Sequence, residues 1–291
     1  MPGLTSIDGA SERIVPLVQA VQDHLNDAIL VVLAFDGVLV EYEEDPAVVH
    51  LSPARRELLR RLVDHPGVTL AIVSGRYLHD LQQLVRLGGE DVFYIGLHGL
   101  EAVGPGFTRI ELETVKQYRE QVHQITAAAE PLISQIYGAR LEDKGVVLAL
   151  HTRQANSSDA VWARLHLLSR AGERTDAQAF RVLRGNHVLE LLPNIGPTKA
   201  AAITAVRDFL EQRERRRVFA VYVGEDVADD DTYDAIEGHG VAAVVGQRAT
   251  RVRHHLESIE VVDQLLARLV ALLDSEEAHR GPTADSAGAL S

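Results

Sequence analysis

Residues 28–39 read Ala-Ile-Leu-Val-Val-Leu-Ala-Phe-Asp-Gly-Val-Leu, and this stretch decides the fold class. Residues 28–35 are apolar without interruption, and Asp36-Gly37 then stops the run. A short apolar run with β-branched residues, ended by a turn pair, is typical of a parallel strand that is buried on both faces. Open α/β sheets place their functional groups in the loops that follow such strands. Asp36 is therefore the first candidate functional residue.

The composition is that of an ordinary globular protein, and it excludes several classes of function. The 291 residues are 46% hydrophobic and 24% charged, enough for a large α/β core with a second domain inserted in it. The formal charge of −13 argues against nucleic acid and anionic membranes as partners. Without cysteine the chain has no disulfide, thiolate metal ligand or cysteine nucleophile. No signal peptide or membrane-spanning run is visible, so we expect a cytoplasmic protein.

Strand and helix patterns alternate along the chain, and a segment of different character interrupts them. The expected elements outside that segment are helix 12–26, strand 29–35, helix 52–64, strand 68–73, a helix ending at 85, strand 91–95, helix 197–213, strand 218–223, helix 231–237, strand 241–245 and helix 259–273. This alternation predicts a parallel sheet with right-handed crossovers. Within the interruption, helices near 113–136 and 158–171 and four short strands indicate an α+β insertion.

The predicted domains follow from this change of pattern. Residues 1–106 and 193–274 form a discontinuous α/β core, and residues 107–192 form the α+β cap. The tail at 275–291 is rich in Gly, Pro, Ala and Ser, and we expect it to be disordered.

Four polar segments stand at the ends of core elements, and the first two are short. Asp36-Gly37 by itself is compatible with a simple turn. Ser74-Gly75-Arg76 stands between a strand and a helix, where a hydroxyl and free backbone N–H groups form an anion site. A serine at such a junction equally serves as a plain helix cap.

The other two segments lie after residue 193. Lys199 stands near a helix start, where its charge opposes the helix dipole, so it requires either a phosphate partner or full solvation. Residues 224–231 read Gly-Glu-Asp-Val-Ala-Asp-Asp-Asp, directly after an apolar strand. Crowded carboxylates repel one another unless a cation or a helix N-terminus absorbs the charge, and oxygen ligands suit Mg²⁺. A solvated acidic helix cap is the plain alternative.

In chain order these segments resemble the four motifs of the haloacid dehalogenase (HAD) phosphatase superfamily. The resemblance implies a Rossmannoid parallel-sheet core, with Asp36 as general acid and base and with Ser74 and Lys199 on the phosphate. It also implies a Mg²⁺ site. Its ligands would be Asp36, Glu225, Asp226 and Asp229. The superfamily places its attacking Asp at the position of Ala34, and a methyl group cannot form a phosphoenzyme.

Further segments resemble trehalose-6-phosphate phosphatases over roughly residues 28–270. The matching segments are Ser74-Gly75-Arg76, Gly96 to Glu101, Glu142-Asp143-Lys144-Gly145, His151-Thr152-Arg153 and Glu190 to Pro193. The resemblance implies that the ligand is trehalose 6-phosphate. The implied substrate-binding residues are Arg76, His98, Glu101, Glu142, Lys144, His151, Arg153 and Glu190. A mixed acidic and basic set matches sugar hydroxyls, which need both donors and acceptors. A surface ion pair is the alternative for any one of them.

The departures from this family concentrate on the chemistry. Besides Ala34, the departing residues are Val38 for Thr, Ala200 for Gly, Glu225 for a metal-binding Asp and Ala228 for Thr. Losing a nucleophile costs on the order of 10⁶ in rate, and the longer arm of Glu225 would weaken Mg²⁺ binding. We therefore predict a trehalose-6-phosphate phosphatase-like protein with strongly reduced or no activity.

Two alternatives stay open. One is a pseudophosphatase that binds trehalose 6-phosphate or a related sugar phosphate in a regulatory role, with a trehalose-synthesis protein as a possible partner. The other is a HAD relative that acts on a different sugar phosphate.

Overall fold

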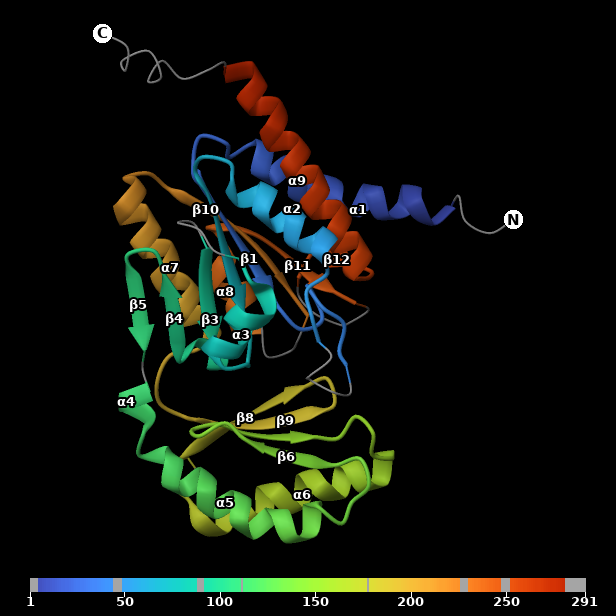
Figure 1. Cartoon of the computed structure of the whole chain (residues 1–291), viewed down its shortest axis with the longest axis vertical. Helices are drawn as coiled ribbons and strands as arrows, with labels where there is room; N and C mark the ends of the chain where they lie inside the picture. Colours follow the sequence, from blue (N-terminus) through green and yellow to red (C-terminus); the bar gives the residue numbers. More distant parts are fainter. Residues whose placement is uncertain are drawn as a thin grey trace.

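The predicted first strand, β1 (Ala28–Ala34), lies inside an eight-stranded sheet in the computed structural model (Figure 1). The structure describes residues 5–43, 49–87, 92–110, 112–176, 178–225, 230–246 and 252–280. β1 pairs in parallel with β10 (Val218–Gly224) on one side and β2 (Val68–Val73) on the other. Its side chains alternate between two separate hydrophobic clusters, one on each face of the sheet. Burial on both faces is why the strand is apolar throughout.

The remaining strands extend this sheet on both sides. Their bounds are β3 (Val92–Gly96), β4 (Glu101–Gly104), β5 (Phe107–Ile110), β11 (Gly240–Val245) and β12 (His254–Leu256). The order is β12-β11-β10-β1-β2-β3-β4-β5, in which the first six strands are parallel and β4 and β5 are antiparallel. The α/β fold class with a parallel-sheet core is confirmed.

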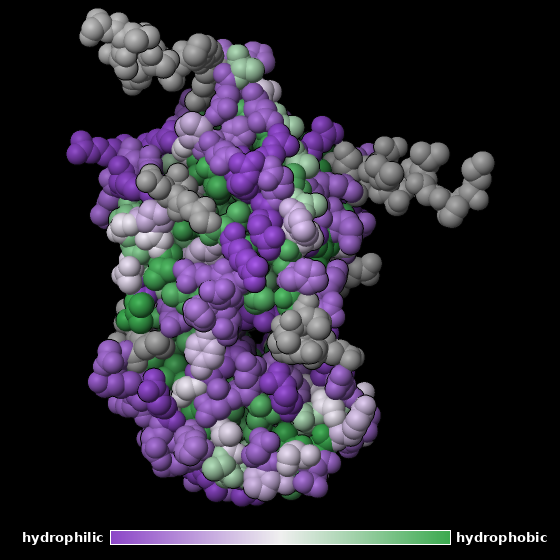
Figure 2. All heavy atoms as spheres, in the orientation of Figure 1, coloured by the Kyte–Doolittle hydropathy of each residue, from purple (hydrophilic) through white to green (hydrophobic). Residues whose placement is uncertain are grey.

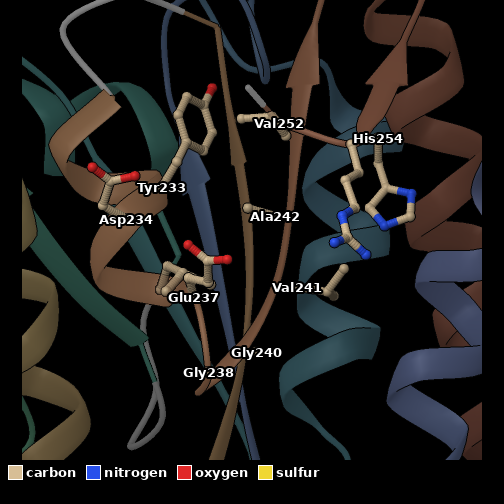
Figure 3. Close-up of a pocket in the computed structure, with 11 residues that line it drawn as sticks. Tyr233, Asp234, Glu237, Gly238, Gly240, Val241, Ala242, Val252 and His254 are labelled. Carbon is tan, nitrogen blue, oxygen red and sulfur yellow. The ribbon is translucent and has the colours of Figure 1, made fainter. Parts of the chain in front are cut away.

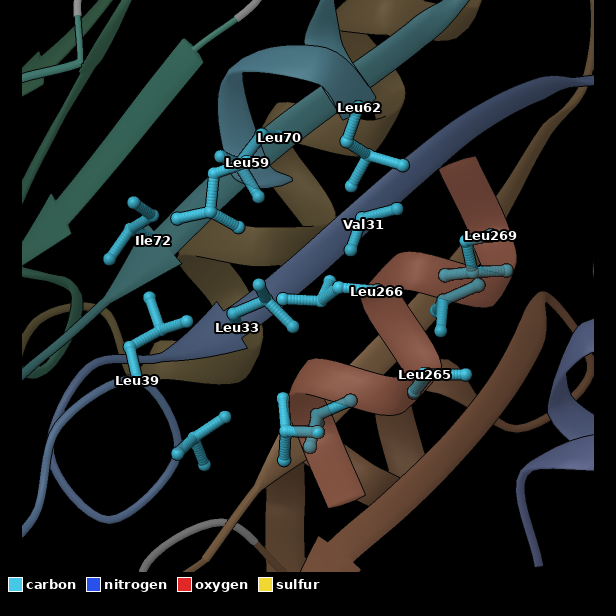
Figure 4. Packing of buried hydrophobic residues seen from close by; sticks show 14 of the residues in the cluster. Val31, Leu33, Leu39, Leu59, Leu62, Leu70, Ile72, Leu265, Leu266 and Leu269 are labelled. Atoms are coloured by element: carbon cyan, nitrogen blue, oxygen red, sulfur yellow. The ribbon is translucent and has the colours of Figure 1, made fainter. Parts of the chain in front are cut away.

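Helices cover both faces of the core sheet. On one face lie α1 (Thr5–Gln22), α2 (Pro53–Val63), α3 (Leu78–Val85) and α9 (Ile259–Arg280), and on the other lie α7 (Lys199–Glu214) and α8 (Asp230–Ile236). Figure 4 shows Leu33 of β1 and Leu59 of α2 in the first cluster with Leu266 of α9. Ser52 caps α2, because its Oγ accepts a hydrogen bond from the Arg55 N–H. No helix in the described ranges is long and apolar enough to cross a membrane.

The inserted segment forms a cap below the core in Figure 1. Its sheet is antiparallel, in the order β6-β7-β9-β8. The strands are β6 (Arg140–Asp143), β7 (Leu148–His151), β8 (Phe180–Gly185) and β9 (Val188–Pro193), and the helices are α4 (Leu112–Val115), α5 (Tyr118–Ile133) and α6 (Ser157–Arg174). α5 and α6 cover the sheet face that is turned away from the core, so the opposite face is turned toward it (Figure 1). Hydrophilic residues extend across the junction on the face seen in Figure 2.

Several boundaries differ from the prediction. The Gly104-Pro105-Gly106 segment is the turn of the β4–β5 hairpin, so the core sheet continues to Ile110 and the cap does not begin at 107. The helix expected at 113–136 is two helices, α4 and α5. β4, β5 and β12 were not predicted, because three or four residues are too few to show an alternating pattern.

The carboxyl-terminal helix is also longer than predicted. α9 continues to Arg280, so residues 275–280 are helical rather than disordered. Glu276, Glu277 and Ala278 are good helix formers, which explains the extension. The rest of the predicted tail, 281–291, lies outside the described residues.

Candidate functional site

The carboxyl ends of β10, β1 and β2 meet at one edge of the core sheet, the edge that the cap faces (Figure 1). The parallel register places Ala34 beside Val73, so the loops after these strands begin at the same level. The first predicted motif is a tight turn, in which Gly37 N–H donates to the Val40 carbonyl over 2.8 Å. The structure thus brings the residues that follow three separate strands to one place, as the sequence predicts.

The Asp36 carboxylate binds the residues of the second predicted motif. Ser74 Oγ donates to Asp36 Oδ2 over 3.2 Å, and Arg76 Nη2 donates to Asp36 Oδ1 over 2.7 Å. Burial acts to lower the pKa of Arg76, but the Asp36 carboxylate outweighs this, and the pKa is raised. Ser74, predicted to bind the phosphate, and Arg76, predicted to bind the substrate, therefore both contact a carboxylate of the chain itself.

Position 34 offers neither a nucleophile nor a metal ligand. The Ala34 methyl stands at the end of β1 and is only 6% exposed. Within the described ranges no three His, Asp or Glu residues are grouped so that they could hold a metal ion. Of the predicted Mg²⁺ ligands, Asp226 and Asp229 lie outside the described residues, and Asp36 faces Arg76. The described residues alone do not form a magnesium site.

Glu225, the remaining predicted ligand, lies against the turn of the first motif. A Cβ added to Gly37 would be 2.4 Å from Glu225 Oε2, so the carboxylate fills the place of a side chain there. Gly37 also has a φ of +74°, a conformation that favours glycine. The Tyr42 hydroxyl donates to Glu225 Oε2. The sequence analysis did not predict Tyr42 as a site residue, and its only signal is an aromatic residue in a polar loop.

A buried ion cluster joins the cap to the core. Glu190 of β9 accepts from Lys144 Nζ over 2.9 Å, and its other carboxylate oxygen is 2.8 Å from His98 Nε2. Lys144 Nζ also donates to the carbonyl of Gly75 over 3.1 Å. Burial acts to raise the pKa of Glu190, but His98 and Lys144 outweigh it, and the pKa is well below its usual value. The three predicted ligand residues therefore form one charged cluster between core and cap.

His98 owes its place to the backbone of its own loop. It lies in the 3₁₀ turn Leu97–Gly99 with a φ of +56°, which is uncommon for a residue with a side chain. Its ring covers Gly75, since a Cβ on that glycine would be 2.4 Å from His98 Nε2. The ring thus lies between the second predicted motif and Glu190.

Two more predicted cap residues pair beside this cluster. Glu142 Oε2 lies 2.7 Å from His151 Nε2. This hydrogen bond and the charge of Lys144 lower the pKa of Glu142 to about 2, against the effect of burial. Arg153 contacts the core, since its Cζ lies 4.8 Å from the centre of the Tyr42 ring. The sugar-binding residues predicted on the cap thus face the predicted phosphate-binding residues of the core.

The Glu101 carboxylate and Lys199 both lie at the start of a helix. Glu101 Oε2 accepts a hydrogen bond from the Leu78 N–H over 3.0 Å, which caps the start of α3. Lys199 is the first residue of α7, after the N-cap Thr198. A Cβ on Gly99 would lie 3.0 Å from the Lys199 nitrogen, so α7 begins against the His98 turn.

A hollow in the structure lies away from these residues. It has a volume of about 510 Å³ and lies between α8, β11 and residues 252–254, where Tyr233, Glu237 and His254 line it (Figure 3). None of the predicted site residues lines it.

The chain is similar to proteins of one family. The trehalose-phosphatase family model matches residues 32–263. The trehalose-phosphate phosphatase of Mycobacterium marinum is 32% identical over 246 residues, which are 83% of this chain and 61% of that protein. This chain thus spans about three fifths of the length of that curated relative. The carboxyl-terminal domain of the Candida albicans trehalose-6-phosphate phosphatase aligns over 90% of this chain and 96% of its own, with a TM-score of 0.72 and 20% identity.

A second solved structure shares the fold at lower identity. The carboxyl-terminal domain of the Candida albicans trehalose synthase regulatory protein aligns over 87% of this chain and 98% of its own, with a TM-score of 0.65 and 12% identity. The HAD-like fold is therefore shared. The family match covers most of the chain, and the motifs fall where the fold brings them together: the chain belongs to the trehalose-phosphatase family.

Proposed function

We propose that this chain binds trehalose 6-phosphate between its core and its cap and releases phosphate from it slowly or not at all. The observation that carries the proposal is the contrast between Ala34 and the Lys144–Glu190 pair. The end of β1 presents a methyl group, whereas Lys144 and Glu190, which we assign to the sugar, are held in a buried ion pair. Ligand binding and phosphate release thus depend on different residues in this proposal.

In this proposal the core holds the phosphate. Ser74 Oγ and the guanidinium of Arg76 donate to phosphate oxygens in place of the Asp36 carboxylate, and Lys199 supplies a further positive charge. On the cap, Glu142, Lys144 and Glu190 offer acceptors and donors to the sugar hydroxyls. Family members of the HAD type usually use Mg²⁺, which shields phosphate charge when it is bound.

The chemical step is weak because no carboxylate stands at position 34. No covalent bond from residue 34 to phosphorus can form, so water attacks directly, with Asp36 taking its proton and then protonating the leaving sugar oxygen. Orientation and charge alone leave a residual acceleration of roughly 10³ over solution.

The second candidate is a regulatory role without turnover. The trehalose synthase regulatory protein shows that this fold occurs in a protein whose name denotes regulation rather than hydrolysis. The departures at Val38, Glu225 and Ala228 support this candidate, because one engineered change at position 34 would not explain them. A trehalose-synthesis protein as partner and a cytoplasmic location stay predictions.

The deciding experiment measures binding and phosphate release separately. Calorimetry with trehalose 6-phosphate, glucose 6-phosphate and inorganic phosphate gives the affinities, and a phosphate-release assay with Mg²⁺ gives the turnover. We expect trehalose 6-phosphate to bind more tightly than the other two, with turnover far below ordinary phosphatase rates. Turnover of about 10 per second would overturn the proposal, since it requires a nucleophile other than residue 34. Equal affinity for all three ligands would exclude the cap as a sugar site.

A further inference from the structure

Three segments that are distant in sequence meet at Tyr42. The tyrosine lies in the loop after β1, Glu225 follows β10, and Arg153 follows β7 on the cap. The Tyr42 ring contacts Arg153 and the Tyr42 hydroxyl contacts Glu225. We call this set of Arg153, Tyr42 and Glu225 the Tyr42 bridge.

The cap side of the bridge is a cation–π contact. Arg153 Cζ lies 4.8 Å from the ring centre, within the roughly 6 Å range of such contacts. Arg153 Nη2 also donates to the carbonyl of Asn186, in the turn between β8 and β9, over 3.2 Å. The cap itself therefore holds the guanidinium over the ring, and a planar guanidinium stacks better there than an ammonium group would.

The core side of the bridge is a hydrogen bond to a fixed carboxylate. The Tyr42 hydroxyl donates to Glu225 Oε2, and that oxygen occupies the space beside Gly37. Glu225 thus sets the direction of the Tyr42 ring, and the ring in turn provides the surface on which Arg153 lies. The same carboxylate touches the turn that carries Asp36.

We propose that Tyr42 is a positioning residue that holds the cap closed over the phosphate site and so favours sugar phosphates over bare phosphate. The inference rests on the proposed function, because it assumes that the cap holds the sugar. The Lys144–Glu190–His98 cluster is a second cap–core contact and consists of other residues than the Tyr42 bridge, so each of the two contacts can be changed by its own substitutions. A group that stabilises the closed form raises the affinity for any ligand that touches both domains. Inorganic phosphate touches only the core, so the bridge leaves its affinity unchanged.

The first test measures cap closure directly. The chain has no cysteine, so Gln82→Cys on α3 and Tyr137→Cys on the cap introduce two unique sites for spin labels. We expect a narrow distance distribution in the parent protein and a second, longer population in Tyr42→Leu and Arg153→Gln. Tyr42→Phe keeps the ring but loses the hydrogen bond, so we expect a smaller second population. Arg184→Gln, an exposed cap arginine outside the bridge, is the matched control and should change nothing.

The second test measures the affinity ratio by calorimetry. Tyr42→Leu should weaken trehalose 6-phosphate binding about three- to tenfold, with inorganic phosphate changed by less than about twofold. Tyr42→Trp retains an aromatic face and should restore most of the loss. Equal weakening of both ligands would reduce Tyr42 to a structural residue and overturn the inference.

The two tests separate this inference from the proposed function. An unchanged distance distribution in Tyr42→Leu and Arg153→Gln would also overturn the inference. If trehalose 6-phosphate fails to bind the parent protein while closure still depends on Tyr42, the bridge is supported and the proposed ligand is wrong. If Tyr42→Leu does not fold, Arg153→Gln and Tyr42→Phe give the same two readouts.

Discussion

The candidate site has two parts: the strand end, with Ala34 and Asp36, and the junction between core and cap, with Glu190, Lys144 and His98. They differ in which of the family's functional groups they retain. At the strand end, Ala34 is a methyl group and Asp36 is bound to Arg76. At the junction, Glu190 is paired with both Lys144 and His98 and is almost fully buried. Buried charges are costly unless they are paired, and the junction buries its charges more fully than the strand end, where Asp36 and Arg76 are each 22% exposed. The comparison suggests that ligand binding and phosphoryl transfer depend on separable groups in this fold.

Restoring the carboxylate at the strand end should have the largest effect. We expect Ala34→Asp to raise phosphate release from trehalose 6-phosphate by up to about 10⁶ if the rest of the site is sound, since this is the order of the cost of losing a nucleophile. The reason is that a nucleophile makes a covalent path available to a ligand that is already held. A phosphate-release assay with Mg²⁺ measures the gain. Ala34→Asn, which has nearly the same shape but no nucleophile, is the control and should stay at the level of the parent.

Ala34→Asp could also leave phosphate release unchanged. It would show that other strand-end residues have failed as well, with Val38 and Glu225 as the first suspects. The strand end would then have lost a whole set of groups rather than one nucleophile.

Breaking the junction should lower the stability of the folded protein. We expect Glu190→Gln to lower the free energy of unfolding by about 3 kcal/mol, because it leaves the buried Lys144 ammonium without its carboxylate. Urea denaturation followed by circular dichroism measures the loss. Glu173→Gln removes an exposed carboxylate from an ion pair on the same cap and should lower the free energy of unfolding far less. A loss in Glu190→Gln as small as in this control would show that the junction is not a constraint.

The pair Glu142–His151 predicts a smaller, pH-dependent effect. The pKa of Glu142 in the folded protein is about 2, below its ordinary value of 4.5, so its contribution to stability is full above 4.5 and is lost as the pH falls toward 2. Since the side chain is 35% exposed, we expect this contribution to be about 1–2 kcal/mol after solvent screening.

Measuring unfolding free energy against pH for Glu142→Gln and the parent checks this prediction. The difference between the two proteins should shrink between pH 4.5 and pH 2. Lys116 lowers the pKa of Glu113 on α4 as well, but this pair is exposed, so the difference between Glu113→Gln and the parent should change less over the same interval. A curve for Glu142→Gln that runs parallel to that of the parent would contradict the pairing with His151.

The fold was predictable where a pattern is long and where burial determines it. β1 and β2 are buried on both faces, so their apolar runs identified them and the loops after them. The short strands β5 and β12 left no such pattern, and the turn at Gly104-Pro105-Gly106 was mistaken for a domain boundary.

The site was predictable as a set of residues but not as a set of contacts. The order of motifs indicated Asp36 and Ser74, because parallel strands bring their carboxyl ends to one edge. Lys144 and Glu190 were indicated by the resemblance of the cap segments to trehalose-6-phosphate phosphatases. That Asp36 binds Arg76 depends on side-chain rotamers, which no spacing encodes. Tyr42 escaped prediction for a related reason, since its partners lie on another strand and on the cap.

The last prediction concerns the Asp36–Arg76 pair and has the smallest expected effect. Because Ser74 and Arg76 both donate to Asp36, this carboxylate competes with any anion that needs the same donors. We expect Asp36→Asn to strengthen the binding of inorganic phosphate about three- to tenfold, since it removes the competing charge and keeps the shape. Calorimetry with phosphate measures the change. Asp80→Asn, on the first turn of α3 near Arg76, is the control and should alter the affinity by less than about twofold. Weaker phosphate binding in Asp36→Asn would mean that Asp36 orients Ser74 and Arg76 for the anion, and the strand end would then be a prepared binding site like the junction.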